Sequence, residues 1–257
     1  MMTPGSFENL SPSLPVLFEK SIHVWCASLD SLAPSAGDFA EALSAEEHQR
    51  ASRFCFAQHR TRFVVARGLL RMLLSHYAGI ETKRLQFCYG AYGKPSLAGA
   101  GEDSQINFNV SHSHELALFA FTRGRAIGVD LERIRPVLDA PQVAQRTFSK
   151  NENSELHALS ESEREQAFFN CWTRKEAFIK AKGKGLSFPL DSFDVSLMPG
   201  EPAKLLRTRF DPEDAASWSL HALHPAAGYA AALAVEGPVE KLACWHWEKR
   251  SDGCLVS

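Results

Sequence analysis

The chain has 257 residues, of which 45% are hydrophobic, and its formal net charge at pH 7 is −2. This length allows one large domain or two small ones, and the hydrophobic share is enough for a substantial core in either case. A net charge close to zero excludes a general electrostatic attraction to nucleic acid or to an acidic membrane surface, so we expect neither as a partner.

The six cysteines are scattered, and none forms a CxxC pair or a zinc-like spacing. Most lie in apolar runs, where a free cysteine behaves as a small core residue. The opening MMTPGSFENLSPSLP lacks the basic and apolar regions of a signal peptide, and no apolar run reaches the length of about 18 residues that marks a membrane span. We therefore expect a reduced, soluble, cytoplasmic protein.

In chain order, the first half begins with a Pro- and Ser-rich stretch, 1–19, which we expect to form an irregular arm. SIHVWCASL (21–29) alternates like a half-buried strand. Ser44 and Glu47 make a capping box for a short helix, and a long helix is predicted over roughly 59–78. Strands are then predicted at RLQFCYG, INFNVSH, ELALFAF and AIGVDLE.

The second half repeats this plan loosely. Ser149 and Glu152 make a capping box for a short helix, and a long helix is predicted from about 162 to 182. Strands are then predicted at SFDVSL, SWSLHAL, YAAALAV and KLACWHW. In both halves a long helix is followed by three strands, before AIGVDLE in the first half and before KLACWHW in the second. This shared order suggests an internal duplication.

Two acids share one face of the strand AIGVDLE. Successive side chains of a strand point to opposite faces, so Asp130 and Glu132 lie on the same side. Neighbouring carboxylates repel one another, and such a pair persists most readily around a cation or cationic partners. Carboxylate oxygens suit Mg²⁺. The alternative is an exposed strand end where Arg133 and Arg135 neutralise the acids.

A third acid lies on the second long helix. Glu176 and Lys180 are one helical turn apart and flank an aromatic stripe. A Glu–Lys pair at this spacing is usually a surface ion pair that contributes about 0.3–0.5 kcal/mol. Because this pair borders an aromatic stripe, we expect partial burial instead, with the carboxylate completing a Mg²⁺ site and the lysine contacting a phosphate.

Several basic or polar residues are candidate anion contacts. The segment HQRASRFCFAQHRTRFVVARGLLR contains six arginines and is either a solvated helix face or a phosphate site. Lys94 lies in the GKP loop, and Ser111 and His112 are predicted at a turn between two strands. The alternatives are a solvated lysine and an ordinary turn histidine. No GxGxxG or GxxxxGK[ST] precedes a helix, so a Rossmann or P-loop nucleotide site is not expected.

In chain order, GKPSL, NFNVSHS, IGVDLE, FSKNE and WTRKEAFIKAKGKGL resemble the Sfp-type 4′-phosphopantetheinyl transferases over roughly 45–197. The resemblance implies an α+β fold of two similar lobes related by pseudo-twofold symmetry, each a small antiparallel sheet packed with a long helix. Coenzyme A would bind in the cleft between the lobes. The implied organisation is an N-terminal arm at 1–19, lobes at 20–125 and 126–247, and a loose tail at 248–257.

The resemblance also implies roles for individual acids. Asp130, Glu132 and Glu176 would hold Mg²⁺ or Mn²⁺, and Lys180 would contact the pyrophosphate during catalysis. Glu152 matches a family acid of debated catalytic role, and its role as a capping residue is an equally strong interpretation.

The coenzyme A contacts implied by the resemblance are Lys94, Ser111, His112 and Lys180. Arg50 matches a basic position that faces the 3′-phosphate, and Arg53 is a second candidate for it. Arg60 and Arg67 could share that role, because the start of the helix aligns poorly.

The implied reaction is attack of a carrier-protein serine hydroxyl on the β-phosphate of coenzyme A, which releases 3′,5′-ADP. Such phosphoryl transfer depends mostly on positioning and charge neutralisation. Glu176 or a metal-bound water would accept the serine proton. The rival functions are a Mg²⁺-dependent hydrolase of coenzyme A or a related nucleotide pyrophosphate, and a coenzyme A-binding scaffold. Because the cleft lies within one chain, we expect a monomer.

Overall fold

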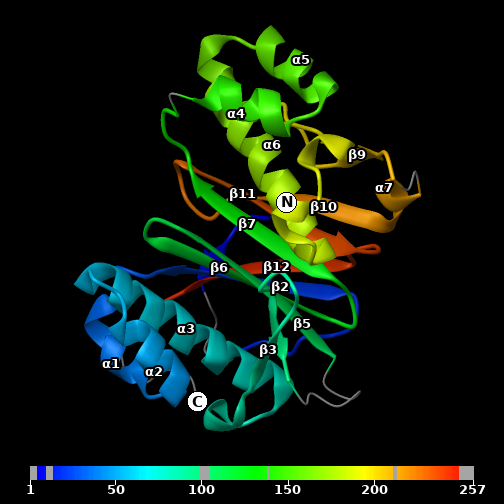
Figure 1. Cartoon of the computed structure of the whole chain (residues 1–257). Helices are drawn as coiled ribbons and strands as arrows, with labels where there is room; N and C mark the ends of the chain where they lie inside the picture. The colour runs from blue at the N-terminus through cyan, green and yellow to red at the C-terminus, as the bar shows by residue number, and fades with distance from the viewer. Residues whose placement is uncertain (1–4, 10–13, 99–104, 138, 211–212, 249–257) are drawn as a thin grey trace.

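The structure is a computed structural model of the chain (Figure 1), and it describes residues 5–9, 14–98, 105–137, 139–210 and 213–248. Parts of the predicted N-terminal arm and most of the predicted tail lie outside these residues. Within the part of the chain that is described, no helix has both the length and the apolar character needed to cross a bilayer.

Two sheets pack face to face, and a long helix covers the outer face of each (Figure 1). One sheet has the order β1 (Glu8–Asn9), β12 (Lys241–Trp247), β2 (Ser21–Ser28), β6 (Leu116–Arg123), β5 (Ile106–Ser113). The other has the order β10 (Trp218–Leu223), β11 (Tyr229–Glu236), β7 (Ile127–Arg133). The covering helices are α3 (Ala57–Ala78) and α6 (Glu161–Lys182). The α+β prediction is confirmed.

The connecting elements are short. In the first lobe they are η1 (Ala33–Ser35), α1 (Ala36–Ala40), α2 (Ala45–Ser52), η2 (Thr82–Arg84), β3 (Phe87–Tyr89) and β4 (Pro95–Leu97). In the second they are α4 (Ala140–Thr147), α5 (Lys150–Ala158), η3 (Gly185–Ser187), η4 (Leu190–Ser192), β8 (Phe193–Val195), β9 (Leu205–Thr208) and α7 (Asp214–Ser217).

The internal repeat suggested by the sequence is visible in the pairing of the strands. β2 pairs antiparallel with β6, which pairs with β5, and β7 pairs in the same way with β11, which pairs with β10. Each long helix follows a helix that begins with a complete capping box, at Ser44 or Ser149. Each long helix also ends at a glycine with a left-handed backbone, Gly79 or Gly183, where a side chain would be strained.

Three expectations about the strands need correction. β12 was predicted within the second lobe, 126–247, but it lies in the first sheet, parallel to β2, where Trp245 packs against Trp25 with tilted rings and 5.0 Å between ring centroids. The arm is not wholly irregular, because β1 pairs with β12. β2 is not half-buried either: its two faces contact α3 and the second sheet, so both are covered.

Candidate active site

β7 and α6 lie unusually close together because of Gly128. A Cβ atom at this position would lie 2.1 Å from the carbonyl oxygen of Ala177 and 2.4 Å from the amide nitrogen of Ala181, far inside contact distance. Any larger residue would therefore push the helix away from the strand. This glycine brings the side chains that project from β7 toward α6 into direct contact with those of the helix.

The predicted division of faces on β7 is confirmed. Val129 and Leu131 are fully buried in the core between the two sheets. Asp130 and Glu132 alternate with them and so project from the opposite face, which α6 covers. Asp130 is only 3% exposed. The alternative of an exposed strand end does not hold for this acid.

Lys180 crosses from α6 to β7. Its amine lies 2.5 Å from Asp130 Oδ1 and donates at 3.1 Å to the hydroxyl of Ser111. The lysine therefore pairs with the strand acid and not with Glu176 one turn away on its own helix. The surface ion pair considered from the sequence is absent from the ion pairs of the described residues.

The pKa values of Glu176 and Glu132 are both raised. Burial raises the pKa of Glu176 to about 7, with the negative charge of Asp130 as the next cause and Lys180 opposing it. Burial also raises the pKa of Glu132, and a hydrogen bond from Ser113 partly offsets this. Asp130 Oδ2 is buried without a hydrogen-bond partner. A buried, unsatisfied carboxylate oxygen beside two further acids is the arrangement expected where a cation belongs.

The donor chemistry of these three acids fits Mg²⁺, which prefers a few carboxylates together with water and phosphate oxygens. Among the described residues, however, no three His, Cys, Asp or Glu side chains are already close enough to form a finished metal site. The charges of the three acids influence one another, but their side chains would still need to move closer together to bind the ion.

Ser111 and His112 both lie within β5, three and two residues before the turn in which they were predicted. The Ser111 hydroxyl accepts from the amide of Leu131 at 3.3 Å and from Lys180, and it donates to Asp130 Oδ1 at 3.0 Å. Its hydrogen-bonding capacity is therefore filled by the protein. Ser113 and Asn109 occupy the same face of β5 and were not predicted from the sequence, although their alternation with Ser111 was the available signal.

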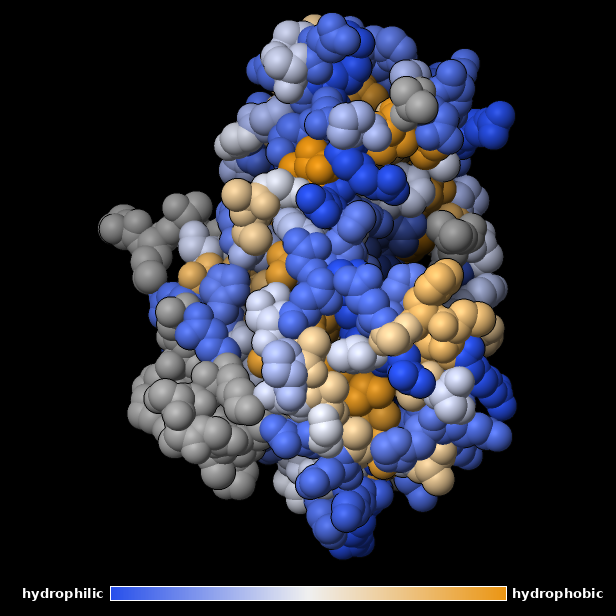
Figure 2. Space-filling model, turned by 90° about the vertical axis from the view of Figure 1, so that its left-hand side faces the viewer, coloured by the Kyte–Doolittle hydropathy of each residue, from blue (hydrophilic) through white to orange (hydrophobic). Residues whose placement is uncertain are grey.

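A pocket of about 690 Å³ lies between α2, α3, the β3–β4 hairpin and the end of β5. Six basic or imidazole side chains contribute to its lining: Arg50, His59, Arg62, Arg67, His112 and His114. On the face shown in Figure 2, hydrophobic side chains gather above and below a mostly hydrophilic middle band, at the level where the two lobes meet. The pocket has the charge and size to hold an anionic ligand.

The arginines of the pocket differ in whether a carboxylate neutralises their charge. Arg62 is paired with Asp30 at 2.6 Å, and Arg67 is paired with Glu47. Arg50 lies over the ring of Phe63, 5.2 Å from its centroid, and has no acidic partner among the described residues. Arg53 and Arg60 are not among the lining residues. Of the arginines predicted to bind the 3′-phosphate, Arg50 is the one that brings an unneutralised charge.

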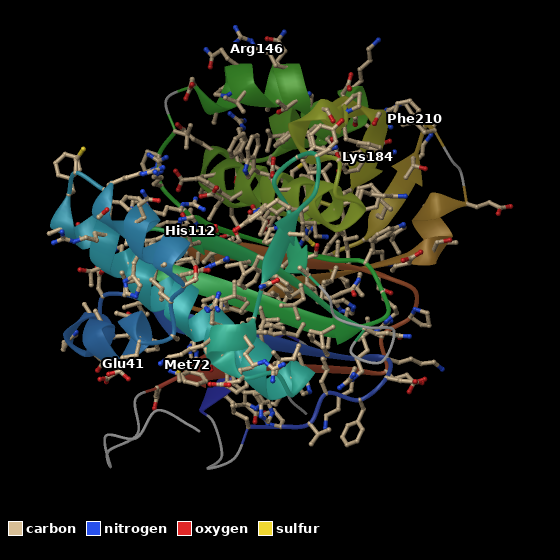
Figure 3. All side chains as sticks on the ribbon, turned by 60° about the horizontal axis from the view of Figure 1, so that its bottom comes forward. Glu41, Met72, His112, Arg146, Lys184 and Phe210 are labelled. Carbon is tan, nitrogen blue, oxygen red and sulfur yellow. The ribbon has the colours of Figure 1, made fainter. Side chains whose placement is uncertain are left out.

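His112 connects the pocket to the acids, because it lines the pocket and follows Ser111 on β5. Figure 3 shows it between the helices of the first lobe and those of the second. Its pKa is lowered, first because neighbouring atoms remove part of its hydration and then because Lys180 and Arg62 are positive. The ring is therefore biased toward its neutral form.

Lys94 points away from the pocket. Its amine donates to the carbonyl oxygens of Ile127 at 2.9 Å and Ala181 at 3.2 Å, and burial lowers its pKa to about 8. It thereby ties the β3–β4 turn of the first lobe to β7 and α6 of the second. In this conformation the amine is bonded to backbone carbonyl groups, so the predicted contact of Lys94 with coenzyme A would require the side chain to move.

Glu152 is 1% exposed and has both oxygens engaged. One oxygen accepts from Ser149 at 2.7 Å and lies 2.8 Å from the amine of Lys175, and the other accepts from Val195 at 2.8 Å. The first lobe repeats this arrangement with a capping-box glutamate, Glu47, paired to a base on α3. The capping interpretation is confirmed, and none of these contacts reaches the acids on β7.

Comparisons with known proteins agree with this geometry. Residues 126–234 match the family model of the 4′-phosphopantetheinyl transferase superfamily, and residues 31–123 match that of the 4′-phosphopantetheinyl transferase N-terminal region. The chain is 39% identical over 236 residues to the 4′-phosphopantetheinyl transferase HetI of Nostoc sp., covering 92% of this chain and 96% of that protein. It is 35% identical over 159 residues to the 4′-phosphopantetheinyl transferase Sfp of Bacillus subtilis, covering 62% and 68%. The chain therefore belongs to the 4′-phosphopantetheinyl transferase family.

Proposed function

We propose that this protein transfers the 4′-phosphopantetheine group of coenzyme A to a serine hydroxyl of apo acyl or peptidyl carrier proteins and releases 3′,5′-ADP, with Mg²⁺ or Mn²⁺ as its cation. Family membership supports the transferase activity and coenzyme A as the substrate. The observation that carries the cation is the buried, unpartnered Oδ2 of Asp130 beside Glu132 and Glu176.

The chain's own residues have separable tasks in this reaction. Arg50 would hold the anionic nucleotide end in the pocket, because its charge is free to meet a phosphate. Lys180 would exchange its contact with Asp130 for a phosphate oxygen once coenzyme A is bound. A cation held by the three acids would withdraw charge from the pyrophosphate. Glu176, on the helix facing Asp130, is our choice to accept the serine proton.

We further propose that the protein acts as a cytoplasmic monomer. The basic pocket and the three acids are all supplied by one chain, so the site needs no second copy. Light scattering of the purified protein with and without coenzyme A tests this. A dimer that alone binds coenzyme A would overturn it.

The activity is tested by incubating the protein with coenzyme A, Mg²⁺ and an apo carrier domain and then measuring the intact mass of the carrier. A gain of one phosphopantetheine group per carrier supports the transferase. Free coenzyme A fragments without that gain would instead identify a hydrolase. The Asp130→Ala variant should lose transfer by orders of magnitude at ordinary Mg²⁺ and recover part of it at high Mg²⁺ or with Mn²⁺, because two of the three acids remain.

A further inference from the structure

The two sheets meet along β5 and β7, which are their edge strands. The described strands form no backbone ladder between these two edges. Side chains of β5 satisfy the amides of β7 instead: Asn109 Oδ1 accepts from Val129 at 2.9 Å, and Ser113 Oγ accepts from Arg133 at 3.1 Å. With the Ser111 contact described above, these three side chains form what we call the polar seam. It places β7, and therefore its acids, against the first lobe.

The two serines of the polar seam repeat one arrangement. Each hydroxyl accepts from a β7 amide and donates to the carboxylate one residue before that amide. Ser111 donates to Asp130 Oδ1 at 3.0 Å, and Ser113 donates to Glu132 Oε2 at 2.9 Å. A hydroxyl has a single hydrogen, and an amide can only donate. Because the amide occupies an acceptor site on the serine oxygen, the hydroxyl hydrogen is directed to the acid.

This arrangement selects which carboxylate oxygens stay free. A serine holds one carboxylate oxygen of Asp130 and one of Glu132. The other oxygen of Asp130, Oδ2, is left without a hydrogen-bond partner. Among the described residues, no hydrogen bond engages Glu132 Oε1. A carboxylate whose second oxygen is tethered loses torsional freedom before a ligand arrives, so less entropy is lost on binding.

We propose that Ser113 is a positioning residue for the cation site: it tethers Glu132 through Oε2 and so presents Oε1, together with Asp130 Oδ2, to the cation. This inference rests on the proposed function, because it requires a cation at these acids. Partners of this kind, which hold a metal ligand from behind, typically contribute 10- to 100-fold to metal affinity.

Ser113 allows a cleaner test than Ser111. Ser111 is 6% exposed, and it also contacts Lys180, so its removal would disturb several groups at once. Ser113 is only partly buried and bonds to the amide of the exposed Arg133. Water can replace the hydroxyl at that amide, so the Ser113→Ala variant should remain folded.

The experiment measures Mn²⁺ binding in the presence of coenzyme A by electron paramagnetic resonance, together with the melting temperature without metal. Ser113→Ala should weaken Mn²⁺ binding by about tenfold or more, whereas Ser113→Thr, which keeps the hydroxyl, should bind within about twofold of the wild type. Ser219→Ala is the matched control: this serine donates to the carbonyl of Gly237 at 2.8 Å, on a strand that does not belong to the seam. The control should leave Mn²⁺ binding unchanged.

The outcomes separate the two proposals. If the wild type binds Mn²⁺ and Ser113→Ala binds it equally well, the positioning role is overturned and the proposed function stands. If Ser113→Thr is as weak as Ser113→Ala, the hydroxyl is not the cause and the inference is again overturned. If the wild type binds no Mn²⁺ at all, the proposed cation site is overturned, and this inference is overturned with it. A drop in melting temperature without a change in Mn²⁺ binding would reduce Ser113 to a structural role.

Discussion

Glu152 and Lys175 offer the sharpest test of which acids belong to the framework and which to the chemistry. Both side chains are buried, at 1% and 0% exposure, and they form an ion pair at 2.8 Å. Removing one partner of a buried pair leaves an uncompensated charge and costs about 3–5 kcal/mol. For a chain of this size, each kcal/mol corresponds to about 2–4 °C. We therefore expect Glu152→Ala to lower the melting temperature by about 6–20 °C.

The test adds the double variant Glu152→Gln with Lys175→Met, which removes both charges and keeps a capping side chain. Replacing a buried ion pair by neutral groups of similar size is often close to neutral in stability. The free energy of unfolding of the double variant, measured in urea, should therefore be close to that of the wild type. Its turnover in the carrier-mass assay should stay within about threefold of the wild-type value. Restored stability with turnover still abolished would refute the reasoning and return Glu152 to the catalytic residues.

Three further predictions concern other parts of the molecule. Gly128→Ala should cost about 1–3 kcal/mol in urea unfolding and abolish transfer, because its Cβ would meet the backbone of α6 at 2.1 Å; a fully active variant would show that the close approach is not needed. Arg50→Ala should raise the Michaelis constant for coenzyme A more than it lowers turnover, as expected when uniform binding is lost; collapsed turnover with unchanged affinity would contradict this. His23 is 3% exposed, and burial, followed by the positive charges of Lys241 and His76, lowers its pKa to about 4. The unfolded chain therefore binds the proton first, so this group's contribution is complete above about pH 6.5 and is lost as the pH falls toward 4. Between pH 7.5 and 5 the wild type should lose about 2 kcal/mol more than His23→Gln, and equal losses in urea titrations would exclude this histidine as the cause.

The features that the sequence predicted correctly are local ones. The long helices were expected at roughly 59–78 and 162–182 and lie at Ala57–Ala78 and Glu161–Lys182. Both capping boxes form as expected, because the serine and the glutamate that make each box are three residues apart. The shared face of Asp130 and Glu132 follows from the two-residue period of a strand. Each of these depends on residues within one or two turns of each other.

The features that could not be predicted depend on contacts between distant segments. Lys180 has Glu176 one turn away, and only the packing of α6 on Gly128 gives it Asp130 as its partner instead. Six arginines lie close together in the sequence, but which of them carries a free charge depends on whether Asp30 or Glu47 reaches it. The direction of the Lys94 side chain likewise depends on carbonyl groups that belong to the other lobe.

The place of β12 has a consequence for how the protein is made. The strand lies between β1 and β2 in the first sheet, yet it consists of residues 241–247, which follow every strand of the second sheet along the chain. Domains generally fold as units, N-terminal first, during translation. Here the first sheet cannot be completed until the whole second lobe has been synthesised, because the edge of β2 stays unpaired until β12 is present. A chain that stops after β11 would contain every acid of the active site and would still expose the edge of β2, so incomplete translation should yield aggregates and not a half-active enzyme.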